Sequence, residues 1–213
     1  MFITFEGPEG GGKSTQARLL AERLHTTGYP VALTREPGGT PAGKAIRAIW
    51  DDPARSDLLP ITDLLLLCAD RAQHVGSLIR PALERGEIVI SDRYADSTRA
   101  YQGYGSGLDV DVMETLLQIA TGGLTPDLTL LLDIPAAEGL ARRHSASQSG
   151  ASPLDRLDQR SLEYHERVHA GYLKLAAQEP ARWVTLDART DLKTLSERIW
   201  QIVQARLAQL PHS

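Results

Sequence analysis

The chain has 213 residues, 42% of them hydrophobic, which is enough to bury the core of one domain. Its 23 basic and 27 acidic residues leave a net charge of −4, which excludes a sequence-wide positive field for nucleic acid, and its single cysteine, Cys68, excludes an internal disulfide and a multi-cysteine metal site. No basic leader opens the chain and no apolar run approaches the ~18 residues of a membrane-spanning helix, so we expect a cytoplasmic protein without membrane or nucleic-acid partners.

Short apolar segments rich in β-branched residues alternate along the chain with longer helical patterns, which is typical of a parallel sheet built from β-α-β units. Apolar residues recur at three- and four-residue steps over 61–83 and 192–207, which predicts two amphipathic helices. We therefore expect one α/β domain over residues 1–213, with a five-stranded parallel sheet flanked by helices. The predicted strands are Phe2–Glu6, Val31–Thr34, Ile88–Ser91, Leu128–Leu132 and Trp183–Leu186.

The first predicted strand runs directly into GPEGGGKS, residues 7–14, which matches the phosphate-binding loop G-x-x-x-x-G-K-[ST]. The glycines let backbone N–H groups converge on phosphate oxygens, and the following helix points its positive end at the same place. Lys13 would add a charge near the β- and γ-phosphates of a bound nucleotide, and Ser14 would offer its hydroxyl to Mg²⁺. The loop predicts a P-loop NTPase fold but leaves a GTPase, a motor ATPase and a small-molecule kinase open. The residues predicted to bind the nucleotide are Gly7, Pro8, Glu9, Gly10, Gly11, Gly12, Lys13, Ser14 and Thr15.

Two arginines, Arg35 and Arg93, each follow a predicted strand. The carboxyl ends of parallel strands face the ligand crevice, so both guanidiniums should converge near the loop and suit a second phosphate. The chain contains no Asn-Lys-x-Asp element, which argues against a GTPase. Asp92 and Asp133 both end an apolar strand, and the local pattern does not decide which of them approaches magnesium.

The segment SASQSGASP, residues 145–153, consists of small polar residues that bury too little apolar area to offset their ordering entropy. We expect it to be mobile. Because it lies between Arg142-Arg143 and Arg156, we interpret residues of about 142–156 as a lid.

Five segments resemble thymidylate kinase of the bacterial type, in that family's order and approximate spacing: FEGPEGGGKSTQ, TREPGGT, SDRYADSTRAYQG, PDLTLLLD and LDRLDQRS. The resemblance covers nearly the whole chain. It implies transfer of the γ-phosphate of ATP to dTMP, giving dTDP and ADP, with Mg²⁺, on the route to dTTP. It also implies a homodimer in which the long helix contributes to the contact.

The resemblance assigns roles to particular positions. The SDRY segment implies that Asp92, with Ser14, holds magnesium and that Asp133 is structural. The catalytic positions are Lys13, Arg93, Arg142 and Arg143, and the lid arginines are Arg142, Arg143 and Arg156. The positions that match substrate-binding residues are Glu9, Arg35, Glu36, Leu67, Arg71, Arg93, Ser97, Thr98, Tyr101 and Gln102.

The main departure from the family pattern is Leu67, where the family usually has a phenylalanine that stacks on thymine. Leu67 and Arg71 are four residues apart and so share one helix face, as a surface that packs against a base and a donor that binds the base should. The alternatives that remain are a kinase for another nucleotide or a nucleoside, and a P-loop ATPase that regulates a partner.

Overall fold

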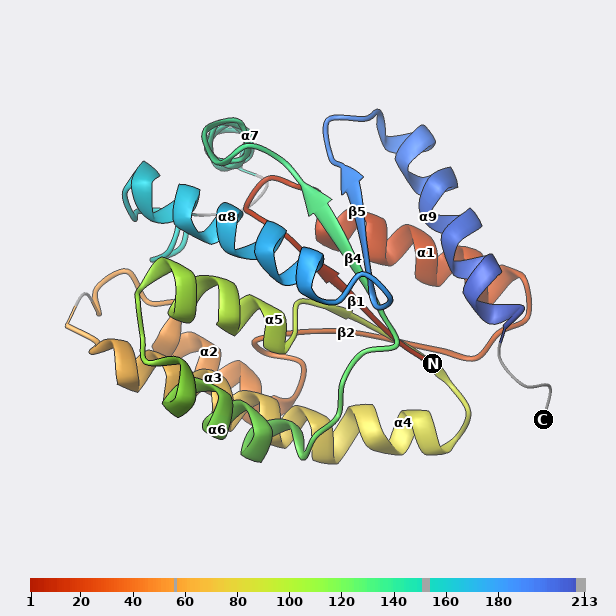
Figure 1. Cartoon of the computed structure of the whole chain (residues 1–213), viewed down its shortest axis with the longest axis horizontal. Helices are drawn as coiled ribbons and strands as arrows, with labels where there is room; N and C mark the ends of the chain where they lie inside the picture. The colour runs from red at the N-terminus through yellow and green to blue at the C-terminus, as the bar shows by residue number, and fades with distance from the viewer. Residues whose placement is uncertain (56, 151–153, 210–213) are drawn as a thin grey trace.

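Five parallel strands form one sheet in the order β2-β3-β1-β4-β5 (Figure 1). The structure is a computed structural model, and it describes residues 1–55, 57–150 and 154–209. It confirms all five predicted strands and the predicted α/β class. The strands are β1 (Phe2–Glu6), β2 (Val31–Arg35), β3 (Ile88–Asp92), β4 (Leu128–Asp133) and β5 (Trp183–Asp187).

Four strands extend one residue beyond the predicted end, and the added residue is charged in each case. The predicted strands end where the apolar pattern ends, whereas the hydrogen-bonded ladder of parallel strands continues for one more residue. Arg35 is the register partner of Asp92, and Asp133 is the register partner of Asp187. These charges therefore lie at the carboxyl edge of the sheet, where open α/β folds bind their ligands.

Helices cover both faces of the sheet (Figure 1). One face packs against α1 (Lys13–Thr26) and α9 (Leu192–Leu207), with alternate residues such as Phe5 and Leu130 in the shared core. The other face packs against α3 (Pro60–His74), α6 (Val110–Thr121) and α8 (Leu162–Gln178). The remaining α-helices of the described ranges are α2 (Pro41–Trp50), α4 (Arg80–Glu84), α5 (Ala95–Thr98) and α7 (Ala136–Gln148).

The long helix predicted over 61–83 is present but contains a wider turn. Between α3 and α4 the residues Val75–Ile79 form a π-helical segment, and the N–H of Arg80 donates to the carbonyl of Val75, five residues back. Pro81 explains the change, because its ring lacks an N–H and collides with the carbonyl four residues earlier in a regular α-helix. A second π-helical segment, Arg99–Gly105, continues α5.

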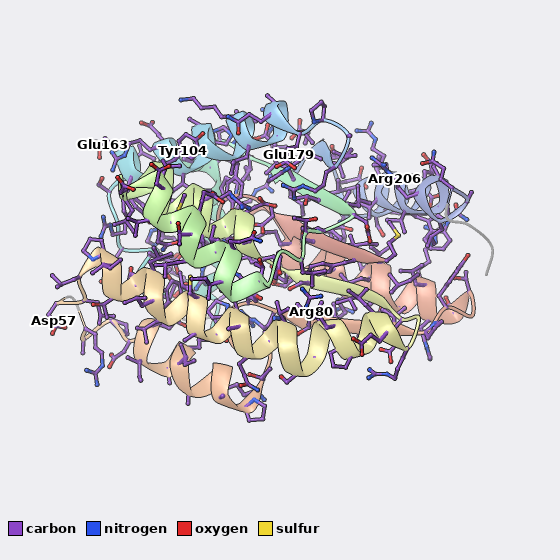
Figure 2. All side chains as sticks on the ribbon, turned by 60° about the horizontal axis from the view of Figure 1, so that its bottom comes forward. Asp57, Arg80, Tyr104, Glu163, Glu179 and Arg206 are labelled. Atoms are coloured by element: carbon purple, nitrogen blue, oxygen red, sulfur yellow. The ribbon has the colours of Figure 1, made fainter. Side chains whose placement is uncertain are left out.

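Arg80 also joins two helices on this face of the sheet (Figure 2). Its Nη2 donates to the carbonyls of Thr121 and Gly122, which lie at the C-terminus of α6, at 3.2 and 2.8 Å. Charged side chains such as Asp57 and Glu163 lie at the surface (Figure 2). Within the described ranges, no helix has the length and apolar content needed to cross a membrane.

The predicted mobile segment 145–153 is partly helical. Residues 145–148 belong to α7, and 149–150 form a turn, whereas 151–153 lie outside the described residues. Ser145 Oγ donates to the carbonyl of Ala141 at 3.0 Å, so a polar side chain that favours loops is accommodated on the helix surface.

Candidate functional site

The phosphate-binding loop connects β1 to α1 and is held close to neighbouring backbone. A Cβ at Gly7 would lie 2.4 Å from the carbonyl oxygen of Leu132, and one at Gly10 would lie 2.2 Å from that of Gly139. Both glycines and Gly12 also have positive φ, of 133°, 70° and 82°. The loop therefore requires glycine at these positions. It leads into the N-terminus of α1, where backbone N–H groups without helical acceptors form a site for anions.

Lys13 is the first residue of α1 and its side chain is buried beside the loop. Its Nζ donates to the carbonyl of Pro8 at 2.6 Å. Burial, reinforced by the charge of Arg93, lowers the pKa of Lys13 from 10.5 to about 8. Keeping the ammonium charged in this buried position therefore costs free energy, which a bound anion would offset.

Ser14 and Asp92 bring a hydroxyl and a carboxylate together at the edge of the loop. Ser14 Oγ donates to Asp92 Oδ2, and Arg35 lies across from Asp92 in the β-ladder. Asp133, the other strand-ending aspartate, instead accepts a hydrogen bond from His169 Nε2 at 2.6 Å and is not one of the described residues that line the cavity. The pair of oxygens at Ser14 and Asp92 suits Mg²⁺, which prefers one or two protein oxygens and completes its shell with phosphates and water.

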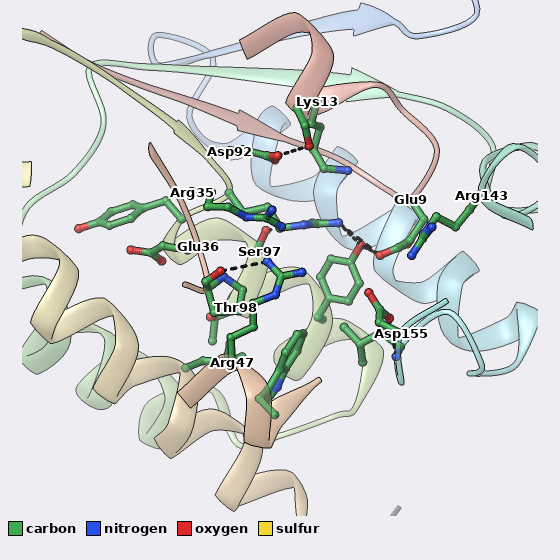
Figure 3. Close-up of a pocket in the computed structure, with 18 of the residues that line it drawn as sticks. Glu9, Lys13, Arg35, Glu36, Arg47, Asp92, Ser97, Thr98, Arg143 and Asp155 are labelled. Carbon is green, nitrogen blue, oxygen red and sulfur yellow. Dashed lines mark hydrogen bonds and ion pairs between the residues drawn. The ribbon is translucent and has the colours of Figure 1, made fainter. Parts of the chain in front are cut away.

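A cavity of about 420 Å³ opens beside the loop (Figure 3). In that view Lys13 and Asp92 lie at the top, Thr98 and Arg47 at the bottom, and Glu9, Arg143 and Asp155 at the right. All ten positions predicted to bind substrate line the cavity, as do six of the nine predicted nucleotide-binding positions: Glu9, Gly10, Gly12, Lys13, Ser14 and Thr15. Gly7, Pro8 and Gly11 lie in the loop but do not line the cavity, in the described structure.

Arg93 occupies the centre of the polar contacts. It is the one non-glycine residue in the described ranges with positive φ, 73°, a conformation that disfavours side chains. The backbone is held there by the N–H of Arg93, which donates to the carbonyl of Phe5 at 3.0 Å, and by Ser91 Oγ, which donates to the carbonyl of Arg93 at 2.7 Å. The guanidinium donates from Nη1 to Gly7 O (3.3 Å), Ser97 Oγ (3.1 Å) and Tyr172 OH (3.1 Å), and from Nη2 to Glu9 Oε1 (3.3 Å) and Tyr101 OH (3.0 Å).

Glu9 is a buried anion between these cations. Burial alone would raise the pKa of Glu9, but His165, Arg93, Lys13 and the hydroxyl of Tyr101 together lower it to about 2. Tyr101 OH donates to Glu9 Oε1, and His165 Nδ1 lies 3.3 Å from Glu9 Oε2. Glu9 therefore remains ionised at neutral pH and holds Tyr101 and Arg93 in place.

A second buried group of polar side chains lies along α3. Arg71 Nε donates to Glu36 Oε2 at 2.8 Å, and Arg71 Nη1 donates to Thr98 Oγ1 at 3.1 Å. His74 links Glu36 Oε1 to Thr34 Oγ1, at 2.8 and 2.7 Å. Arg71 and Glu36 are 2% and 4% exposed, so this ion pair sets the position of Arg71 at the wall of the cavity.

The three predicted lid arginines are not brought together. Arg143 lines the cavity and forms an ion pair of 2.9 Å with Asp158. Arg142 points elsewhere, with bonds to the carbonyl of Ala188 (2.9 Å) and to Glu138 (3.0 Å). Arg156 is bound to Asp63 at 2.6 Å and to the carbonyl of Trp50 at 3.1 Å.

Sequence reasoning missed several residues of the site. Trp50 lines the cavity together with Leu67 and lies in the same buried cluster, and Asp155 lines the cavity beside the lid. Tyr172 reaches Arg93 from α8, and its position in an apolar helical repeat gave no functional signal. The position of Trp50 could have indicated a role, because it ends α2, the helix that directly follows TREPGGT.

Comparisons with known proteins find one family that is similar to this chain in sequence and in fold. The sequence model of one family, described as Thymidylate kinase, matches residues 5–199. Thymidylate kinase from Roseiflexus sp. (strain RS-1) is 54% identical over 99% of this chain and 96% of its own. Thymidylate kinase from Thermomicrobium roseum is 52% identical over 95% of this chain and 93% of its own. The crystal structure of thymidylate kinase from Ehrlichia chaffeensis superposes with a TM-score of 0.77 at 32% identity, covering 96% of this chain and 98% of that one.

Proposed function

Because this chain belongs to the thymidylate kinase family and phosphorylates dTMP to dTDP with ATP, we propose that its cavity holds the two nucleotides with their phosphates facing each other. One observation carries this arrangement: Lys13 and Ser14 of the phosphate-binding loop line the same cavity as the guanidiniums of Arg35 and Arg93. An ammonium with a hydroxyl, and a pair of guanidiniums, each suited to a phosphate, thus lie side by side at the carboxyl edge of the sheet.

On the ATP side, the backbone of residues 7–15 wraps the β- and γ-phosphates and Lys13 neutralises them. The phosphates replace the carbonyl of Pro8 as the partner of the ammonium. Ser14 and Asp92 would hold Mg²⁺, whose charge offsets that of the phosphate oxygens when it is bound.

On the acceptor side, Arg93 and Arg35 bind the phosphate of dTMP. Glu9 and Tyr101 contact its sugar. Arg71, fixed by Glu36, donates to the thymine ring together with Thr98 and Gln102. Leu67 supplies an aliphatic surface for the ring. Tyr101 is buried and bonded to both Glu9 and Arg93, so it forms a fixed wall against which a ribose 2′-hydroxyl would collide.

Phosphoryl transfer requires alignment of the acceptor oxygen with the γ-phosphate and stabilisation of the charge on the transferred group. Lys13, Arg93 and Arg143 all line the cavity, and we assign this stabilisation to them. Arg142 and Arg156 can reach the transferred group only after their ion pairs with Glu138 and Asp63 break. We therefore assign these two arginines to a closed form of the lid over about 142–156. Closure would also exclude water, which competes with dTMP for the phosphoryl group.

We further propose that the protein is a homodimer that acts in the cytoplasm, in the synthesis of dTTP. Two adjacent helices leave large apolar side chains exposed: Ile61 and Leu65 on α3, at 38% and 49%, and Val112 and Ile119 on α6, at 47% and 72%. Such side chains on one pair of helices are typical of an interface. Light scattering coupled to size-exclusion chromatography tests this, since Leu65→Glu with Ile119→Glu should convert a dimer to a monomer.

A coupled assay of ADP release tests the proposed acceptor site, with ATP, Mg²⁺ and either dTMP, dUMP, thymidine or no acceptor. We expect fast release only with dTMP, slower release with dUMP, and none above background with thymidine. Equal rates with and without an acceptor would identify an ATPase and overturn the proposed arrangement.

A further inference from the structure

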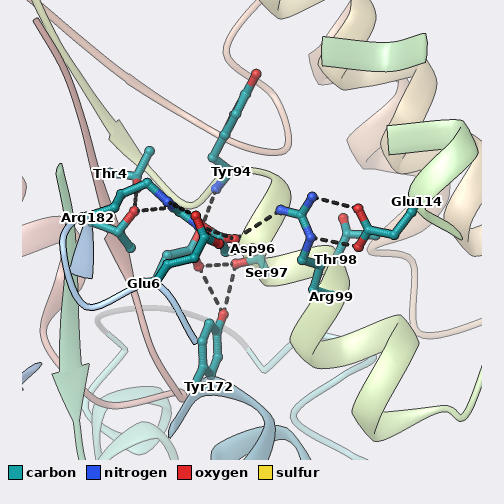
Figure 4. A network of polar contacts seen from close by, with 12 residues as sticks. Thr4, Glu6, Tyr94, Asp96, Ser97, Thr98, Arg99, Glu114, Tyr172 and Arg182 are labelled. Carbon is teal, nitrogen blue, oxygen red and sulfur yellow. Dashed lines mark hydrogen bonds and ion pairs between the residues drawn. The ribbon is translucent and has the colours of Figure 1, made fainter. Parts of the chain in front are cut away.

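Glu6 is a fully buried carboxylate at the end of β1, immediately before the phosphate-binding loop (Figure 4). Its side chain is 0% exposed, and it is not one of the described residues that line the cavity. Burying a carboxylate costs free energy unless its oxygens accept hydrogen bonds, so the cost of burying Glu6 depends on the groups that surround it.

Three groups donate hydrogen bonds to the Glu6 carboxylate. The backbone N–H of Tyr94 donates to Oε1 at 2.8 Å. The hydroxyls of Ser97 and Tyr172 both donate to Oε2, at 2.5 and 3.0 Å, and lie 2.9 Å from each other (Figure 4). These three residues come from the turn after β3, from α5 and from α8, so Glu6 joins three separate parts of the fold.

The same two hydroxyls accept hydrogen bonds from Arg93. Arg93 Nη1 lies 3.1 Å from Ser97 Oγ and 3.1 Å from Tyr172 OH. A hydroxyl has one hydrogen to donate and lone pairs with which to accept. When Glu6 takes both hydrogens, the lone pairs of Ser97 and Tyr172 remain for the guanidinium. Without an acceptor at Glu6, a hydroxyl hydrogen could turn toward Arg93 Nη1, where two donors would face each other.

We propose that Glu6 is a positioning residue for Arg93: its carboxylate orients the hydroxyls of Ser97 and Tyr172, and these in turn hold the guanidinium toward the phosphate of dTMP. This inference rests on the proposed function, in which Arg93 binds that phosphate. It requires no contact between Glu6 and either substrate.

The charges around Glu6 act on the ionisation of its carboxylate in both directions. Asp96, on α5, opposes its ionisation and is itself held by Arg99 at 3.0 Å and by Arg182 at 2.6 Å. Arg93 favours ionisation, and Lys13 is a further cation that interacts with Glu6. Burial, followed by the charge of Asp96, raises the pKa of Glu6 from 4.5 to about 7. The proposed role belongs to the ionised form of Glu6, which Arg93 and the hydroxyl of Ser97 favour and which predominates above pH 7.

Glu6→Gln tests the inference, because the amide cannot reproduce the carboxylate in either orientation. One orientation places its NH₂ against the N–H of Tyr94, and the other places it against the two hydroxyls. Calorimetric titration with dTMP and with thymidine separates contacts to the phosphate from contacts to the base. We expect the dTMP Kd to rise by about tenfold or more, as for the loss of a charge-assisted hydrogen bond, while the thymidine Kd is unchanged.

Glu114→Gln is the matched control. Glu114 belongs to the same polar network and bonds Arg99 at 2.7 Å, but it is on α6 and, in the described part of the chain, makes no hydrogen bond or ion pair with Ser97 or Tyr172. Its removal should leave both Kd values unchanged. Equal weakening of dTMP and thymidine in Glu6→Gln, or no weakening of either, would overturn the inference.

Two further variants keep the result decisive. If Glu6→Gln does not fold, as judged by circular dichroism, Tyr172→Phe removes one of the two hydroxyls that link Glu6 to Arg93 and should weaken the binding of dTMP but not of thymidine; an unchanged dTMP Kd there would count against the link. Arg93→Lys separates the two proposals. If it leaves the preference for dTMP over thymidine intact, the proposed role of Arg93 fails; if it abolishes the preference while Glu6→Gln does not, only the role of Glu6 fails.

Discussion

The ammonium of Lys13 donates to the carbonyl oxygen of Pro8, at 2.6 Å, within the loop that binds phosphate. In the proposed complex with ATP, the lysine exchanges this neutral acceptor for an anionic one. Because burial already disfavours its charge, the protonation of Lys13 becomes part of ATP binding.

We expect ATP affinity to fall as the pH rises above about 8. The protonated form of Lys13 binds the phosphates, and its pKa in the free enzyme is about 8, so each further pH unit reduces affinity by up to about tenfold. Calorimetric titration between pH 7 and pH 9.5 measures this. Lys13→Arg, which does not titrate in that range, should show a flat profile; a fall of equal size in that variant would assign the effect to another group.

The stability of the free enzyme should depend on Glu6 between pH 4.5 and pH 7. Its pKa is higher in the folded chain than in the unfolded chain, so the folded state binds more protons across this window and stability falls as the pH rises. The loss is on the order of 3 kcal/mol. Thermal unfolding at pH 5 and pH 8 should show a smaller decline for Glu6→Gln than for the wild type; parallel declines would contradict the assignment.

Trp50 should compensate for the missing aromatic residue at position 67. Both side chains line the cavity and share a buried cluster, so the indole offers the ring surface that Leu67 lacks. Trp50→Leu should raise the dTMP KM by about 2- to 10-fold, the value of an aromatic contact, with a smaller change in kcat. Leu67→Phe in the Trp50→Leu background should recover most of the loss, and steady-state kinetics of the double variant decides this.

Arg143 and Arg142 should differ in their effect on turnover. Arg143 already lines the cavity, whereas Arg142 is bonded to Ala188 and Glu138 away from it. Arg143→Ala should lower kcat by about 10³-fold, as for the loss of an arginine finger. Arg142→Ala should have a smaller effect on single-turnover rates. The reverse order would assign the transferred phosphate to Arg142 in the closed lid.

The sequence predicted the parts of the site that depend on short motifs. Gly7–Ser14 and the strand ends at Arg35 and Arg93 could be placed because a parallel sheet puts the carboxyl ends of its strands at one edge. Trp50, Tyr172 and Glu6 could not be identified, because each belongs to an apolar pattern that predicts only core packing, and their contacts join segments far apart in the chain. The helical state of 145–148 was also missed, since small polar residues on an exposed helix face carry the same composition as a loop.

The left-handed backbone of Arg93 has a consequence for how this enzyme can change. Glycine would adopt that conformation without penalty, so the substitution most favourable to the turn is also one that deletes the central cation of the site. The same substitution would remove the guanidinium that is bonded to the buried carboxylate of Glu9, so the relief of backbone strain is offset by a buried charge that has lost one of its partners. The contacts of the side chain, and not the preference of the backbone, therefore account for an arginine at this position.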